Sequence, residues 1–99
     1  MEQIIIAISE SAYADLKDIE NYISQDSPAI ARKFISRIFD KIDQLYAYPE
    51  SGKSVPELGD KSIRELLLSK YRIIYQIVDE QNINIVRVIH GSRLLDIEF

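Results

Sequence analysis

The chain has 99 residues, 46% of them hydrophobic and 28% charged, which is enough for a single folded domain over residues 1–99. A net charge of −4 argues against a protein that binds nucleic acid over its whole surface. The absence of cysteine excludes disulfides, thiolate metal sites and a cysteine nucleophile. One histidine alone cannot build a histidine-rich metal site, and we expect no metal and no cofactor.

A run of isoleucines predicts a first strand over residues 3–9. Because this run is apolar on both faces, we expect it to lie inside a sheet. From residue 10 the apolar residues recur at helical spacings of four, three and four, from Ala12 to Ile23, which predicts a helix over residues 10–24.

Ser27 and Pro28 predict the start of a second helix, with a capping hydroxyl followed by proline at the first helical position. Its apolar face continues until Pro49, so we expect it to end near residue 48. The short link between the helices predicts an antiparallel helical hairpin. Residues 49–62 are rich in proline and glycine and are predicted to form a long loop, and such loops often carry function.

Three apolar runs, at residues 63–69, 71–78 and 83–89, predict an antiparallel meander of strands. The predicted order is therefore β-α-α-β-β-β. The fold class is α+β, with the helical hairpin packed on one face of a small, twisted, mainly antiparallel sheet. No apolar run is long enough to span a bilayer and no basic leader is evident, so we expect a cytoplasmic protein without membrane contact.

Basic side chains gather in the second half of the chain. Alternation within residues 71–78 places Arg72 and Gln76 opposite the more apolar set, and so on the open face of the sheet. Arg64, Arg87 and Arg93 add to a surface that we expect to be locally positive. Such a patch suits phosphate, RNA or an acidic protein segment, and the alternative is that each arginine pairs with a nearby carboxylate.

His90 has two interpretations. Its ordinary pKa suits an acid or base near neutral pH, but a single histidine at a strand end also serves as a structural residue bonded to backbone. The sequence contains no glycine-rich phosphate loop, no nucleophile elbow and no metal-ligand spacing. From the residues alone, we expect a small α+β domain that acts as a binding module.

A series of short segments between about residues 8 and 95 carries a family resemblance. In chain order these are 14–19 (ADLKDI), 22–23 (YI), 27–28 (SP) with Ala31, Leu45 with Pro49-x-x-Gly52, 55–58 (VPEL), 64–66 (REL), 71–75 (YRIIY) and His90-Gly91-x-Arg93. In this order and spacing they resemble the ParE/RelE superfamily of toxins from type II toxin–antitoxin systems, and specifically its ParE-like branch. The β-α-α-β-β-β order of that family agrees with the order expected above.

The resemblance implies a growth-inhibiting toxin that a cognate antitoxin holds inactive. In this family the disordered C-terminal part of the antitoxin wraps the toxin and folds on it. The antitoxin's N-terminal part usually binds operator DNA, so the toxin reaches DNA only indirectly. We expect acidic and apolar antitoxin residues to cover the helix surface, the open sheet around Arg72, or both.

The superfamily divides by target, and the residues at the matching positions favour one branch. RelE-like members cut mRNA on the ribosome, whereas ParE-like members poison DNA gyrase and are not known as nucleases. Arg72 and Arg93 match phosphate-binding arginines of the RelE branch. The two lysines of that branch are replaced here by Ile63 and Glu65, and its catalytic tyrosine by Phe99, which cannot transfer a proton. The resemblance therefore favours a gyrase poison that is not an enzyme.

Two alternatives stay open at this point. The first is a ribosome-dependent mRNA endoribonuclease that uses Arg72, His90 and Arg93, with Glu57 or Glu65 assisting the histidine. The second is a degenerate member that only binds its antitoxin. In the favoured interpretation Arg64, Arg72 and Arg93 bind the target or a phosphate.

Overall fold

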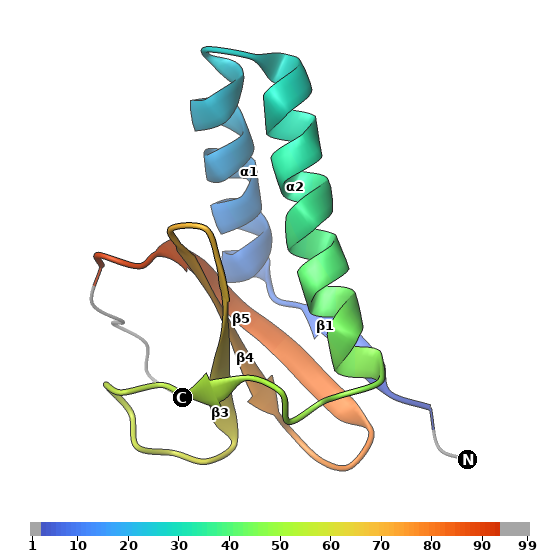
Figure 1. Ribbon diagram of the computed structural model, residues 1–99. Coiled ribbons are helices and arrows are strands. Elements are labelled where there is room, and N and C mark those ends of the chain that lie inside the picture. Colours follow the sequence, from blue (N-terminus) through green and yellow to red (C-terminus); the bar gives the residue numbers. More distant parts are fainter. Residues whose placement is uncertain (1–2, 94–99) are drawn as a thin grey trace.

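The computed structural model describes residues 3–93 and shows a helical hairpin packed against one face of a five-stranded sheet (Figure 1). The predicted α+β class is confirmed. The elements are β1 (Ile5–Ile8), α1 (Glu10–Ser24), α2 (Pro28–Asp43), the 3₁₀ helix η1 (Gln44–Tyr46), β2 (Lys53–Ser54), β3 (Ile63–Leu68), β4 (Tyr71–Ile77) and β5 (Asn82–His90).

Both helices begin at residues whose side chains cap them. The Ser9 hydroxyl accepts a hydrogen bond from the backbone N–H of Ala12, and the Ser27 hydroxyl accepts one from that of Ile30. Pro28 follows in the first helical position of α2, as expected. The α-helix ends at Asp43, earlier than predicted, because its last turn tightens into η1.

The sheet order is β1-β5-β4-β3-β2, and β1 runs parallel to β5 while the other neighbours are antiparallel. The expectation that the first strand lies inside the sheet is wrong, because β1 forms one of its edges. Its residues alternate between the core, where Ile6 and Ile8 pack, and solvent, where Ile5 is 59% exposed. The two-residue strand β2, at the opposite edge, was not predicted.

A β-bulge in β5 changes which of its side chains face the helices. Tyr75 of β4 pairs with Ile85, whereas the preceding residue of β4 pairs with Arg87, so Val86 is an extra residue. Ile85 and Val88 therefore both pack in the core beneath the helices, while Val86 packs on the other face. Simple alternation would place Val86 on the same face as Val88, and it does not hold across the bulge.

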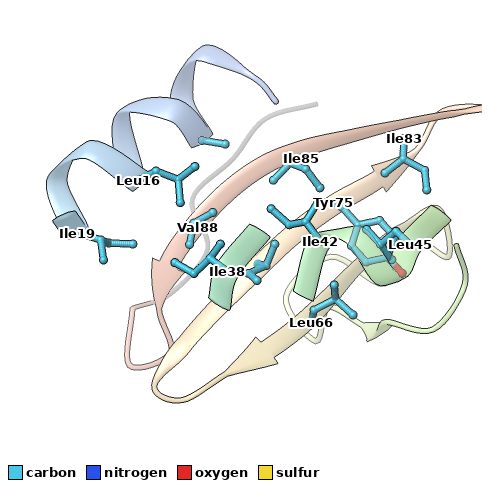
Figure 2. Packing of buried hydrophobic residues seen from close by; sticks show 12 residues of the cluster. Leu16, Ile19, Ile38, Ile42, Leu45, Leu66, Tyr75, Ile83, Ile85 and Val88 are labelled. Atoms are coloured by element: carbon cyan, nitrogen blue, oxygen red, sulfur yellow. The ribbon is translucent and has the colours of Figure 1, made fainter. Parts of the chain in front are cut away.

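The sheet has a hydrophobic cluster on each face. The larger one lies between the helices and the sheet, where Tyr75 and side chains of α1 and α2 converge (Figure 2). The smaller one, on the opposite face, joins Ile63, Ile74 and Ile89 of the strands to Val55 and Leu58 of the 49–62 loop, with Val86 packed against it. The face that we expected to be open is thus partly covered by this loop.

The start of α1 protects the edge of β5 beyond the end of β1. The Ser9 hydroxyl donates to the carbonyl of Val86 at 3.0 Å, and an Asp15 carboxylate oxygen accepts from the N–H of Val88 at 2.8 Å. Asp15 also accepts two hydrogen bonds from the Arg87 guanidinium, at 2.7 and 3.0 Å. These bonds raise the pKa of Arg87, and for this arginine the ion-pair interpretation is correct.

Candidate functional site

Arg72 of β4 lies on the face opposite the helices, enclosed by two carboxylates. Its Nε and Nη2 donate to Glu65 at 3.1 and 3.0 Å, and its Nη1 and Nη2 donate to Glu57 at 2.7 and 2.8 Å. A fifth bond runs from Nη1 to the backbone carbonyl of Arg93 at 3.3 Å. A guanidinium has five N–H donors, so every donor of Arg72 is used within the chain.

Arg72 itself is ion-paired and adds no free positive charge to the expected patch. The hydrogen bonds to Glu57, and then those to Glu65, raise the pKa of Arg72, which stays charged. Two carboxylates bind this one guanidinium, while Lys53 and Arg93 also line the cavity beside it. Arg72 is also buried, with 8% of its surface exposed, so the sequence placed it on the correct face but wrongly predicted that it lies open there.

The loop that carries Glu57 is fixed from beneath by Tyr75 and Arg64. The buried Tyr75 hydroxyl accepts from the N–H of Gly52 and donates to the carbonyl of Pro49, both at 2.9 Å. Arg64 Nη1 donates to the carbonyls of Glu50 and Gly52. A Cβ at Gly52 would lie 2.6 Å from the Tyr75 ring, so only glycine fits this close approach. Arg64 thus holds the backbone of the 49–62 loop in place.

His90 lies on the helix side of the sheet. It pairs with Tyr71, whose ring packs edge-on against the imidazole at a centroid distance of 5.6 Å and also contacts Phe34 of α2. The imidazole Nδ1 accepts from the N–H of Ser92 at 3.1 Å, so the proton of the neutral ring lies on Nε2. Arg72 pairs with Ile89, the residue before His90 in β5, and faces the other way, so the sheet separates Arg72 from His90.

Of the remaining predicted site residues, Arg93 lies beside both Arg72 and His90: its N–H donates to the His90 carbonyl at 3.0 Å, and its own carbonyl accepts from Arg72. Arg93 is exposed and lines both a cavity of about 530 Å³ beside Arg72 and a smaller one beside His90. Ile63 is buried in the smaller hydrophobic cluster. Phe99 lies outside the described residues. Glu57, which we considered only as a companion of His90, is instead a ligand of Arg72, and the signal for this was its place in the VPEL segment of the loop.

Neither a metal site nor a membrane span is found in the part of the chain that the structure describes. Residues 3–93 contain no group of three or more histidine, aspartate or glutamate side chains placed to hold a metal ion. No helix within this range is long and apolar enough to cross a membrane.

The fold and these motifs define a small toxin of the ParE/RelE type, and comparison with known proteins agrees. The family described as "ParE toxin of type II toxin-antitoxin system, parDE" matches residues 6–95. Toxin RelE2 of Caulobacter vibrioides is 36% identical over 83 residues, which cover 84% of this chain and 90% of that protein. A chain in the structure "Chromosomal ParDE TA system from P. aeruginosa" shares the fold, with a TM-score of 0.73 and 21% identity over 90% of this chain and 97% of that one. The chain therefore belongs to the ParE toxin family.

This membership establishes the general function and one partner. The protein is the toxin component of a type II toxin–antitoxin system. Its partner is an antitoxin. The segments that carried the resemblance also have a structural explanation, because four of them meet at one cluster. VPEL supplies Glu57, REL supplies Glu65, YRIIY supplies Arg72, and the segment after His90 supplies the carbonyl of Arg93.

Proposed function

We propose that this toxin arrests growth by binding DNA gyrase through protein–protein contacts, and that its cognate antitoxin neutralises it by covering the toxin surface. The observation that carries the proposal is the saturation of Arg72. A phosphate could reach its guanidinium only by displacing a carboxylate that already forms two hydrogen bonds with it.

A second line of support concerns acid–base chemistry. A nuclease of the RelE type needs a phosphate-binding arginine, a base and an acid directed at one phosphodiester. Here Arg72 and His90 lie on opposite faces of the sheet, and the two strand positions that would hold lysines carry buried Ile63 and ion-paired Glu65. This arrangement favours a role in binding over RNA cleavage.

We place the antitoxin in a groove of about 540 Å³ between the helical hairpin and the β3–β4 turn. Its walls include Tyr22, Ile23, Phe34, Tyr71 and His90, and the Tyr22 side chain is 70% exposed. Aromatic and aliphatic walls suit the apolar residues of a segment that folds on binding. At the alternative surface around Arg72, Glu57 and Glu65 already occupy the guanidinium, which therefore has no donor left for an acidic segment.

The test is induction of the toxin in cells that lack the antitoxin, with growth, DNA breakage and mRNA integrity followed together. We expect growth arrest with broken DNA and intact mRNA, and inhibition of purified gyrase by the purified toxin. Arrest with mRNA cut at codons would establish the ribonuclease alternative instead. Normal growth on expression of folded toxin would identify a degenerate member.

A variant of His90 provides a matched control. His90→Phe keeps an aromatic ring against Tyr71 but removes both ring nitrogens. If the toxin binds gyrase, this variant remains toxic and folded. Loss of toxicity in a His90→Phe protein with an unchanged circular dichroism spectrum and melting temperature would contradict the proposal, because only a role for the imidazole nitrogens would explain it.

A further inference from the structure

A second groove, of about 730 Å³, lies at the end of the molecule away from the tip of the helical hairpin. It is bounded by Ile4, just before β1, by residues 47–51 after η1, and by the β4–β5 turn. These segments meet at the lower right of Figure 1. Its volume falls within the range of about 300–1,000 Å³ that is usual for ligand sites. Within residues 3–93 it shares no lining residue with the cavity beside Arg72 or with the groove assigned to the antitoxin.

The floor of this groove is apolar and its rim is acidic. Ile77 and Ile83 of the sheet contribute to the floor, while Glu50 and the pair Asp79 and Glu80 come from two different bounding segments. Among the residues that the structure describes, no lysine or arginine lines the groove. Hydrogen bonds lower the pKa of Asp79, and the bond from the backbone N–H of Gln81 contributes most. This carboxylate is therefore ionised at neutral pH. The chemistry therefore suits an apolar group with positive charges beside it.

An exposed aromatic ring strengthens the preference for cations. Tyr48 lines the groove and is 69% exposed. The face of an aromatic ring attracts lysine and arginine side chains, in addition to the attraction of nearby carboxylates. Acidic and aromatic groups thus favour the same kind of ligand.

Hydrogen bonds fix the walls in place. The carbonyl of Pro49 is held by the Tyr75 hydroxyl, and that of Glu50 by Arg64. On the other wall the Asp79 carboxylate accepts from the N–H groups of the two residues that follow Glu80, which closes the β4–β5 turn. The groove is therefore preformed, and binding does not require a loop to become ordered.

We propose that this groove binds a segment of a partner protein in which an apolar side chain is flanked by lysine or arginine. The apolar side chain covers Ile77 and Ile83, and the flanking cations approach Glu50 from one side and Asp79 and Glu80 from the other. A segment with cations on both sides of its apolar residue matches carboxylates on two walls. This proposal does not depend on the proposed action on gyrase, so a measurement of binding tests it separately.

The test follows backbone amide NMR signals of the purified full chain during titration with an acetylated and amidated tripeptide, lysine–leucine–lysine. We expect shifts that map to the lining segments, with a dissociation constant near about 1 mM. The peptides glutamate–leucine–glutamate and lysine–serine–lysine test the charge and the apolar anchor, and each is expected to bind at least tenfold more weakly.

Charge-reversal variants supply the matched control. Glu50→Lys combined with Glu80→Lys reverses the rim, whereas Glu20→Lys combined with Asp40→Lys makes the same change in net charge on exposed helix positions. We expect at least tenfold weaker binding for the first pair and less than a twofold change for the second.

Three results would overturn the proposal. The first is an absence of amide NMR shifts at about 10 mM peptide, a concentration far above the expected dissociation constant. The second is an equal loss of binding in the two double variants, which would mean that the peptide responds only to net charge. The third is a shift of the same amides on raising the protein concentration without peptide, which would show that a second copy of the chain fills the groove.

Discussion

The enclosure of Arg72 leads to a quantitative prediction for stability. Arg72→Met keeps an apolar stem of similar length but leaves Glu65, whose side chain is 3% exposed, without its cation. Removing one partner of a buried ion pair costs about 3–5 kcal/mol. Since small domains unfold with a total of about 5–15 kcal/mol, we expect this variant to lose a large share of its stability.

Urea unfolding followed by circular dichroism measures the effect. With a slope of about 1–3 kcal/mol per molar urea, the midpoint of Arg72→Met falls by at least about 1 M. Glu57→Gln is expected to cost only about 1 kcal/mol, because the Glu57 side chain is 21% exposed and the amide oxygen of glutamine still accepts a hydrogen bond. Combining Arg72→Met with Glu65→Met recovers about 2 kcal/mol or more, because no buried charge remains.

The same variants distinguish the roles of Arg72 in function. If the arginine holds the structure together, growth arrest declines with the folded fraction in Arg72→Met, and Glu57→Gln is no more toxic than the unaltered chain. A phosphate-binding Arg72 would become more accessible in Glu57→Gln, and RNA cleavage would rise. An Arg72→Met protein within about 1 kcal/mol of the unaltered chain would refute the reasoning.

Three further predictions test individual contacts. Gly52→Ala places a Cβ 2.6 Å from the Tyr75 ring and 2.8 Å from a backbone carbonyl of β3, and thermal unfolding should show a loss of about 2 kcal/mol or more. Tyr75→Phe leaves two backbone groups of the 49–62 loop unpaired, at a cost of about 1–3 kcal/mol. Burial raises the pKa of Tyr75, so the unaltered chain loses stability as the pH rises above about 10, and Tyr75→Phe lacks this component. Asp15→Ala removes the acceptor for the Val88 N–H and for Arg87, and we expect concentration-dependent association by light scattering because the edge of β5 is then open.

The helices were predictable because their signals are local. The apolar spacing defined α1 with the bounds that the structure shows, and the pair Ser27 and Pro28 defined the start of α2. Capping hydroxyls, proline and a helical apolar stripe all act within a few residues of one another. The strands β3, β4 and β5 were likewise found from their composition, with ends shifted by one residue in most cases.

The sheet order and the candidate site depended on contacts distant in sequence. The isoleucine run of β1 was apolar on both faces, yet Ile5 remains exposed at an edge, because the run alone does not specify its neighbour. The bulge at Val86 has no signature in a single sequence. Arg72 was placed on the correct face, but its enclosure depends on Glu57, which an irregular loop brings to it.

The parallel pairing of β1 with β5 has a consequence for biosynthesis. Among the described strands β1 pairs with β5 alone, and the bond between Ser9 and Val86 joins residues 77 positions apart. At about 5–20 residues per second, a ribosome needs roughly 4–15 s to extend the chain from one to the other. During that interval the first strand has no sheet to join, so the toxin takes its final shape only after its last strand has left the ribosome.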